Sequence, residues 1–148
     1  MGPSIYALRF TGVAEQLEGA EGVLRAATSS PSSTVRSSID DRGVTGTIEA
    51  DPGGEARFES KVQFTGEATF EERGVIRFGD AGAIHFSTVG EGRLGGSPQE
   101  GVQHGCVCWR IDSGEGRYEG ATGLITSNFT VDTMGTVADY QFGLIWVK

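Results

Sequence analysis

Apolar and polar residues alternate with a period of two along much of the chain. The longest such run covers residues 56–71, where even-numbered positions such as Phe58, Val62 and Phe70 are apolar or small and odd-numbered positions are polar. A strand with one buried face has this period, whereas a helix repeats its apolar residues about every 3.6 positions. We therefore predict a long half-buried strand that either bends at Gly66 or spans a tall barrel wall.

Shorter segments of β-forming residues precede and follow this run, with turn-forming residues between them. We predict further strands over residues 5–13, 23–28, 34–39, 44–50, 75–78, 83–89, 103–111, 124–131 and 140–147. Turns are predicted at residues 40–43, 51–54, 79–82 and 132–135, and the last of these joins the final two strands as a hairpin. Residues 90–101 hold five glycines and a proline, which predicts a long mobile loop that serves as a lid.

These elements make the chain all-β, with roughly eight strands in a single domain over residues 1–148. Apolar residues continue to the end of the chain, at Phe142, Trp146 and Val147, as expected if the last strand pairs back and removes the edges of the sheet. We predict a closed eight-stranded antiparallel up-and-down β-barrel. An immunoglobulin-like sandwich is disfavoured because the Cys…Trp…Cys spacing is missing.

Charge and hydropathy narrow the class of partner. The chain has 12 basic and 20 acidic residues, a net charge of −8, and its apolar runs stay far below the 18 or so residues that span a bilayer. Phosphate backbones and anionic lipid repel such a chain, so we expect it to bind neither nucleic acid nor a membrane. The N-terminus lacks the basic and apolar segments of a signal peptide, and we expect a cytoplasmic protein.

Cys106 and Cys108 are the two cysteines, and they stand two residues apart on a predicted strand. A disulfide between residues that share a strand face at this spacing is strained, and a metal site usually takes four ligands. We predict two small buried thiols, with a nucleophile or a soft ligand as the alternative. No metal is expected.

Residues 114–123 read Gly-Glu-Gly-Arg-Tyr-Glu-Gly-Ala-Thr-Gly. Four glycines around one ring, Tyr118, predict a tight corner that the ring braces. The corner resembles the Gly-x-Gly-x-(aromatic)-x-Gly-(small)-x-Gly motif of the allene oxide cyclase-like barrels. That group contains plant allene oxide cyclases, dirigent proteins and bacterial barrels that catalyse cyclisations in polyketide pathways. The resemblance covers these residues directly and the strand at 124–131 loosely.

The resemblance implies a barrel of calycin-like size with an apolar lumen that is open at one end. It also implies a homodimer or a homotrimer, and enzymes of the group use no cofactor. Such enzymes hold a reactive, mostly apolar substrate in a folded shape, because positioning alone lowers the barrier to one ring closure. No run in the N-terminal half matches the catalytic residues of the cyclases, so none of those roles is carried over.

The strand at 103–111 has two faces of different character. One carries His104, Cys106, Cys108 and Arg110, and the other carries Gly105, Val107, Trp109 and Ile111. We favour the second set as the inward face, because buried His and Arg side chains are costly unless they are paired. In the alternative, Trp109 points outward into a subunit interface and the first set lines the lumen.

Candidate catalytic residues are those able to move a proton or to donate a hydrogen bond at the barrel wall or mouth: Glu91, His104 and Tyr140. Each has a structural alternative, namely a solvated surface glutamate, a hydrogen-bonded histidine and a tyrosine outside the lumen. Candidate substrate-binding residues are predicted from strand positions: Phe64, Phe86, Cys106, Cys108, Trp109, Asn128, Phe142 and Trp146.

Together these features predict a cofactor-independent cyclase or isomerase that acts on a hydrophobic, polyketide- or fatty-acid-derived small molecule. This hypothesis requires a lumen of several hundred Å³, roughly the size of ordinary ligand sites, lined by aromatic side chains with a few polar groups. The alternative is a non-catalytic barrel that binds a lipophilic ligand. A third interpretation is a structural oligomer whose outer surface is its working part.

Overall fold

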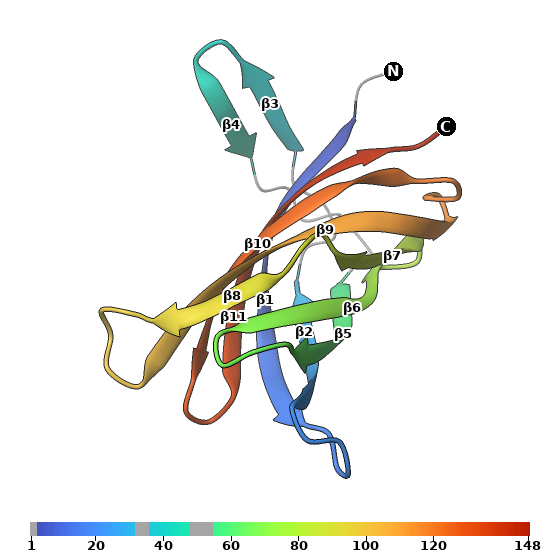
Figure 1. Cartoon of the computed structure of the whole chain (residues 1–148). Coiled ribbons are helices and arrows are strands. Elements are labelled where there is room, and N and C mark those ends of the chain that lie inside the picture. The colour runs from blue at the N-terminus through green and yellow to red at the C-terminus, as the bar shows by residue number, and fades with distance from the viewer. Residues whose placement is uncertain (1–2, 32–35, 48–54) are drawn as a thin grey trace.

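The computed structural model describes residues 3–31, 36–47 and 55–148, and every regular element in these ranges is a β-strand (Figure 1). The strands are β1 (Ser4–Gln16), β2 (Val23–Ser30), β3 (Arg36–Asp40), β4 (Gly43–Thr47), β5 (Ala56–Phe64), β6 (Thr69–Phe78), β7 (Gly82–Thr88), β8 (Gly92–Gly96), β9 (Val102–Gly116), β10 (Thr122–Asp132) and β11 (Thr136–Trp146).

The main sheet closes on itself as an antiparallel barrel. Its strands follow the order β10-β11-β1-β2-β5-β6-β7-β9-β8, and β10 also pairs with β9, which joins the two ends. β8 pairs with β6 and β9 beyond the end of β7, so β7 and β8 share one place in the wall and the barrel is eight-stranded. Closure was predicted, and it leaves no long unpaired edge in this sheet. β3 and β4 form a separate two-stranded sheet that projects from one end (Figure 1).

The two ends of the barrel differ. The β1–β2, β5–β6, β8–β9 and β10–β11 connections all lie at one end, which we call the hairpin end (Figure 1). Both chain termini and the β3–β4 sheet lie at the other, which we call the termini end. In the described ranges no helix has the length and apolar character needed to cross a membrane.

The long alternating run forms two strands rather than one. β5 ends at Phe64, residues 65–68 make a turn around Gly66, and β6 returns with Phe70 opposite Phe64. The Thr65 amide donates to the Thr69 carbonyl at 2.9 Å across this turn. The prediction of one strand that spans a tall barrel wall is therefore wrong. The chain does change direction at Gly66, as the other alternative predicted, but it does so through a turn between two strands. The four-residue turn keeps the alternation in phase, so the even-numbered side chains point inward in both β5 and β6.

The segment predicted as a mobile lid is mostly a strand and its turn. β8 pairs Arg93 with Cys106 on β9 and Gly92 with Phe70 on β6. Glycine at position 92 allows this pairing, because a Cβ there would collide with the Phe70 ring. The lid prediction is wrong, since pairing on two sides holds this segment in the barrel wall.

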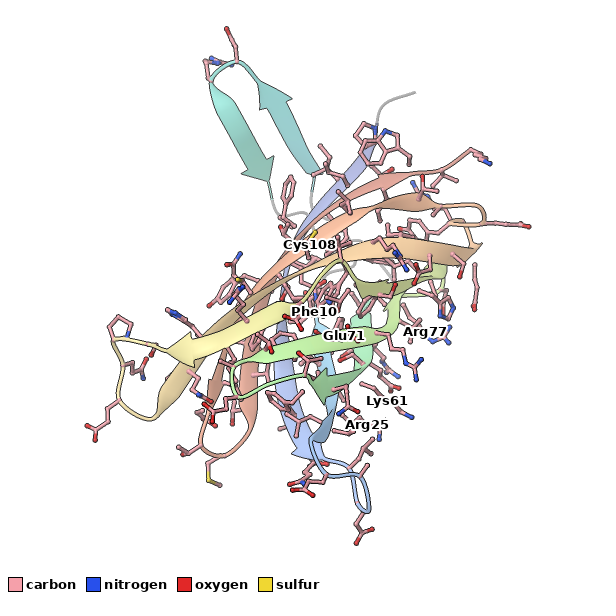
Figure 2. The ribbon with its side chains drawn as sticks, in the orientation of Figure 1. Phe10, Arg25, Lys61, Glu71, Arg77 and Cys108 are labelled. Atoms are coloured by element: carbon pink, nitrogen blue, oxygen red, sulfur yellow. The ribbon has the colours of Figure 1, made fainter. Side chains whose placement is uncertain are left out.

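Side chains fill the termini end and the middle of the barrel. Phe58, Phe86 and Trp109 form a stack in the middle, with ring centroids 4.5 to 5.5 Å apart. Phe10 lies among these interior side chains, whereas Arg25 and Lys61 point away from the barrel (Figure 2). Aromatic pairs at such separations pack favourably beyond the area they bury.

The glycine-rich corner closes the termini end. Tyr118 is buried there, and its ring centroid lies 5.1 Å from that of Phe78. A Cβ at Gly114 would collide with the Tyr118 carbonyl, and Gly116 and Gly120 have positive φ angles of 61° and 72°. Glycine adopts such angles readily, so the corner needs its glycines, and Tyr118 braces it as predicted.

Candidate functional site

A cavity of about 80 Å³ lies inside the barrel near the hairpin end. Apolar side chains from several strands line it, including Leu24, Val62, Phe64, Leu94, Phe129 and Val131. Four polar side chains share the same cavity: Thr28, Glu72, Ser127 and Asp139. Phe58 also lines it, and this ring belongs to the aromatic stack with Phe86 and Trp109. The cavity therefore combines an apolar wall with a small group of convergent polar atoms.

Asp139 is held inside the barrel by an inward position on β11 and by a hydrogen-bond chain. Ser127 Oγ donates to Asp139 Oδ1 at 2.6 Å, and Gln141 Nε2 donates to Asp139 Oδ2 at 2.7 Å. The Tyr6 hydroxyl in turn donates to Gln141 Oε1 at 3.0 Å. Burial raises the pKa of Asp139 from 3.8 to about 6, although the hydrogen bonds from Ser127 and Gln141 lower it. Desolvation thus outweighs hydrogen bonding, and the side chain is still ionised at neutral pH.

Glu72 reaches the same cavity from an inward position on β6. Ser60 Oγ donates to Glu72 Oε1 at 2.5 Å, and the Glu72 amide and carbonyl both bond to Thr88 Oγ1 at 2.7 Å. Burial raises the pKa of Glu72 from 4.5 to about 8; the hydrogen bond from Ser60 lowers it, and the charge of Asp139 raises it further. Glu72 is therefore largely protonated at neutral pH.

The two carboxyl groups make an acid and a base inside one cavity. At neutral pH Glu72 is able to donate a proton and Asp139 to accept one, which is the division of roles that opposed pKa shifts produce in acid–base sites. Within the described part of the chain neither carboxylate forms an ion pair. Both are almost fully buried, with exposed fractions of 7 % for Glu72 and 5 % for Asp139.

Two further buried polar atoms next to the carboxyl groups lack a full complement of bonds. The Thr28 hydroxyl has no hydrogen-bond partner among the described residues, and neither has the Trp109 indole N–H. The indole lies close enough to lower the pKa of Glu72, but the pair misses hydrogen-bond geometry. Buried polar atoms without a partner are uncommon in proteins, and a ligand or a water in the cavity would satisfy the Thr28 hydroxyl.

The favoured inward face of β9 is confirmed. Val107, Trp109 and Ile111 are buried, whereas Cys106 is exposed and Cys108 half-buried. The prediction of two buried thiols is therefore wrong, because both cysteines occupy outward positions of β9. The alternative in which His104, Cys106 and Cys108 line the lumen is therefore wrong for this strand. Of the predicted substrate-binding residues, Phe64 lines the cavity, whereas Phe86 and Trp109 are buried in the aromatic stack and do not line it.

Three other predicted site residues, Phe142, Trp146 and Glu91, have side chains that point away from the barrel interior. Phe142 and Trp146 occupy outward positions on β11, since the alternate residues Gln141 and Ile145 are buried. Glu91 is exposed and accepts a hydrogen bond from Thr65 Oγ1 at 3.0 Å. None of these three faces the cavity, because strand parity turns the β11 side chains away and Glu91 lies in the connection between β7 and β8.

Four predicted site residues meet in an open groove of about 450 Å³ on the outer face of β8 to β11: His104, Cys106, Asn128 and Tyr140. Register places Cys106, Asn128 and Tyr140 side by side, with Asn128 opposite both of the others. Arg93 continues this row on β8, and Arg9 lies over the Tyr140 ring at 5.8 Å. The prediction that these residues act in the lumen is corrected, because they occupy the outward positions of their strands.

Glu72 and Asp139 were missed by the sequence-based prediction. The signal was present, because Glu72 continues the even-numbered apolar face of the run through Phe70, Ile76 and Phe78. A carboxylate at a strand position that is otherwise apolar points to a buried ionisable group. Asp139 was harder to recognise, because the neighbouring residues on its strand face, Gln141 and Gly143, are not apolar side chains.

The fold and the cavity define a closed eight-stranded antiparallel β-barrel with an apolar pocket that holds two carboxyl groups. No family model matches the chain, and neither does any curated protein or solved structure. The resemblance to the allene oxide cyclase-like barrels therefore stays a prediction from the glycine-rich corner.

Proposed function

We propose that the protein binds one end of a lipophilic small molecule in the cavity at its hairpin end. The observation that carries this proposal is the combination, in one pocket, of apolar walls with two buried carboxyl groups and the Thr28 hydroxyl, which lacks a partner among the described residues. At about 80 Å³ the cavity is smaller than the several hundred Å³ expected for a whole substrate. A ligand would therefore insert one end and leave the rest at the mouth, between Leu24, Phe64 and Val131.

A pair of alanines on β2 offers a matched test. Ala26 lines the cavity, whereas its neighbour Ala27 points outward beside Glu59. Ala26→Leu fills the cavity, so it should weaken binding of a neutral naphthylamine dye at least about tenfold, a loss of roughly 1.4 kcal/mol. Ala27→Leu should leave the affinity within about twofold of the original. Equal affinities for the two variants would place any dye elsewhere and refute the proposal.

A second candidate function is cofactor-independent isomerisation or cyclisation of a carbonyl compound. It is favoured by one observation, the acid and the base that share the cavity. Asp139 would remove a proton from the carbon next to a carbonyl while Glu72 protonates the carbonyl oxygen, which gives an enol. Asp139 would then return its proton to a different carbon and Glu72 would recover the enol proton, so that both groups regain their starting states.

Deuterium exchange distinguishes catalysis from binding alone. Under this candidate function, the protein in D₂O should speed exchange of the α-hydrogens of a medium-chain enone, followed by proton NMR, and Asp139→Asn should abolish the acceleration. An outer-surface control, Asp112→Asn, should retain it. Dye binding without any accelerated exchange would favour the non-catalytic ligand-binding barrel.

We also propose that the barrel forms a homodimer or homotrimer through its outer face. Leu124, Tyr140 and Trp146 on β10 and β11 are large apolar or aromatic residues that remain exposed, with exposed fractions of 48 %, 53 % and 42 %. Exposed apolar side chains gathered on one face are typical of protein contacts. Sedimentation equilibrium should show an oligomer that Trp146→Lys weakens. A cytoplasmic location remains a prediction from the sequence.

A further inference from the structure

The interior of the barrel carries negative charge without a matching cation. Two carboxyl groups line the cavity, of which Asp139 is ionised and Glu72 largely protonated at neutral pH in the absence of a ligand. Among the described residues no Lys or Arg side chain lines it. An isolated buried charge is costly, and proteins usually pair it or hydrogen-bond it fully. No described side chain of the cavity supplies a positive charge to balance Asp139, and a bound cation would supply it.

The polar atoms of the cavity are acceptors placed to receive several donors. Glu72 Oε1 accepts from Ser60, and the Trp109 indole N–H, the other donor near this carboxyl group, misses hydrogen-bond geometry. Each Asp139 oxygen accepts one hydrogen bond and keeps capacity for a second. Thr28 is 7 % exposed, and its hydroxyl oxygen is also without a partner. An alkylammonium group has three N–H donors, so each of these three side chains could accept one of them.

Aromatic rings surround the same space. Phe64, Phe70 and Phe129 line the cavity, with ring centroids 6.4 Å apart for Phe64–Phe70 and 5.9 Å apart for Phe70–Phe129. Phe58 closes the inner side. The face of an aromatic ring attracts a cation, and the attraction grows where water is excluded. The wall is thus compatible with a positive head group as well as with an alkyl chain.

The entrance has the same electrostatic preference. The connections at the hairpin end, residues 17–22, 65–68, 97–101 and 133–135, contain no Lys or Arg. They carry four exposed glutamates: Glu18, Glu21, Glu67 and Glu100. The exposed Glu91 of the β7–β8 connection also reaches this end, where it accepts a hydrogen bond from Thr65. A rim of one sign raises the local concentration of ligands of the opposite sign, and here it favours cations over anions.

We infer that the ligand is a lipophilic primary amine, bound with its ammonium head between Asp139, Glu72 and Thr28 and with its alkyl chain at the apolar mouth. This inference rests on the proposed ligand-binding function and names the class of ligand. The cavity has room for the head and its first carbons, and Leu24, Val62 and Val131 would contact the carbons that follow. A carboxylate of the same length would meet Asp139 with like charge.

Three probes of equal chain length separate the contributions of charge and chain. Isothermal titration calorimetry near neutral pH and low salt would compare octylammonium, 1-octanol and octanoate, all below the concentrations at which they aggregate. We expect octylammonium to bind at least tenfold more tightly than octanol, and octanoate to show no binding. Asp139→Asn should remove the preference for the amine over the alcohol, and Glu72→Gln should reduce it. Asp112→Asn, on the outer surface, should leave the preference unchanged.

The outcomes separate failure of this inference from failure of the proposed function. Equal binding of octylammonium and octanol, both lost in Ala26→Leu, would overturn the amine assignment and leave ligand binding in place. A preference for the amine that survives in both Asp139→Asn and Glu72→Gln would place the amine outside this cavity and also overturn the inference. If none of the three probes binds, or if Ala26→Leu changes no affinity, the proposed function fails as well. Circular dichroism would establish that each variant is folded.

Discussion

Replacement of Glu72 by glutamine should stabilise the protein increasingly as the pH rises. The folded chain holds the pKa of Glu72 at about 8, against 4.5 for the free side chain. Between these values the folded state binds more protons than the unfolded state, so the stability of the original protein falls as the pH rises from 4.5 to 8. Glutamine has nearly the same shape, can still accept the bond from Ser60, and does not titrate.

The size of the effect follows from the shift. Each unit of pKa corresponds to about 1.4 kcal/mol, so Glu72→Gln should gain about 3 kcal/mol at pH 7 and about 5 kcal/mol at pH 9, while pH 4.5 should show little difference. Asp139 titrates in both proteins, so its contribution to the pH dependence of the free energy of unfolding cancels in the comparison. Ligand-free protein is needed, because a bound cation would oppose the effect.

Urea denaturation at pH 4.5, 7 and 9, followed by the fluorescence of the buried Trp109, measures the gain as a shift of the midpoint at constant m-value. Glu71→Gln is the matched control, because Glu71 is the preceding residue and is exposed on the outer face. It should change the free energy of unfolding by less than about 0.5 kcal/mol at each pH. A gain for Glu72→Gln that is flat with pH, or a loss that deepens with pH, would show that Glu72 is not held protonated by burial.

Three other predictions concern the wall and the corner. Gly92→Ala should lower the free energy of unfolding by about 1–3 kcal/mol, because its Cβ would meet the Phe70 ring. Gly95→Ala, on the same strand, has open space around its Cβ and should be nearly neutral. Urea denaturation would measure both. Tyr118→Ala should cost about 3 kcal/mol or more by removing the ring that packs on Phe78, and the exposed Glu119→Ala should not, as thermal unfolding would show. Cys106 should react with a maleimide faster than the half-buried Cys108 when labelling is followed by mass spectrometry, and equal rates would contradict the greater exposure of Cys106 on the shared outer face of β9.

The sequence alone determined the parts of this protein that depend on neighbouring residues. A period of two fixes which side chains share a face of a strand, and it held through β5 and β6 even where one predicted strand became two. The glycine-rich corner around Tyr118 was readable because its glycines are needed locally. The inward face of β9 followed from the cost of burying His104 and Arg110.

Only the tertiary structure decided what the inward faces enclose. β11 pairs with both β1 and β10, and this long-range register brings Asp139 to the same cavity as Glu72 from strands far apart in the chain. The same closure turned His104, Cys106, Asn128 and Tyr140 together onto the outer surface. Alternation tells which residues lie on one face, but whether that face is dry or wet depends on sheet closure, and closure is set by contacts between residues that the local pattern does not connect.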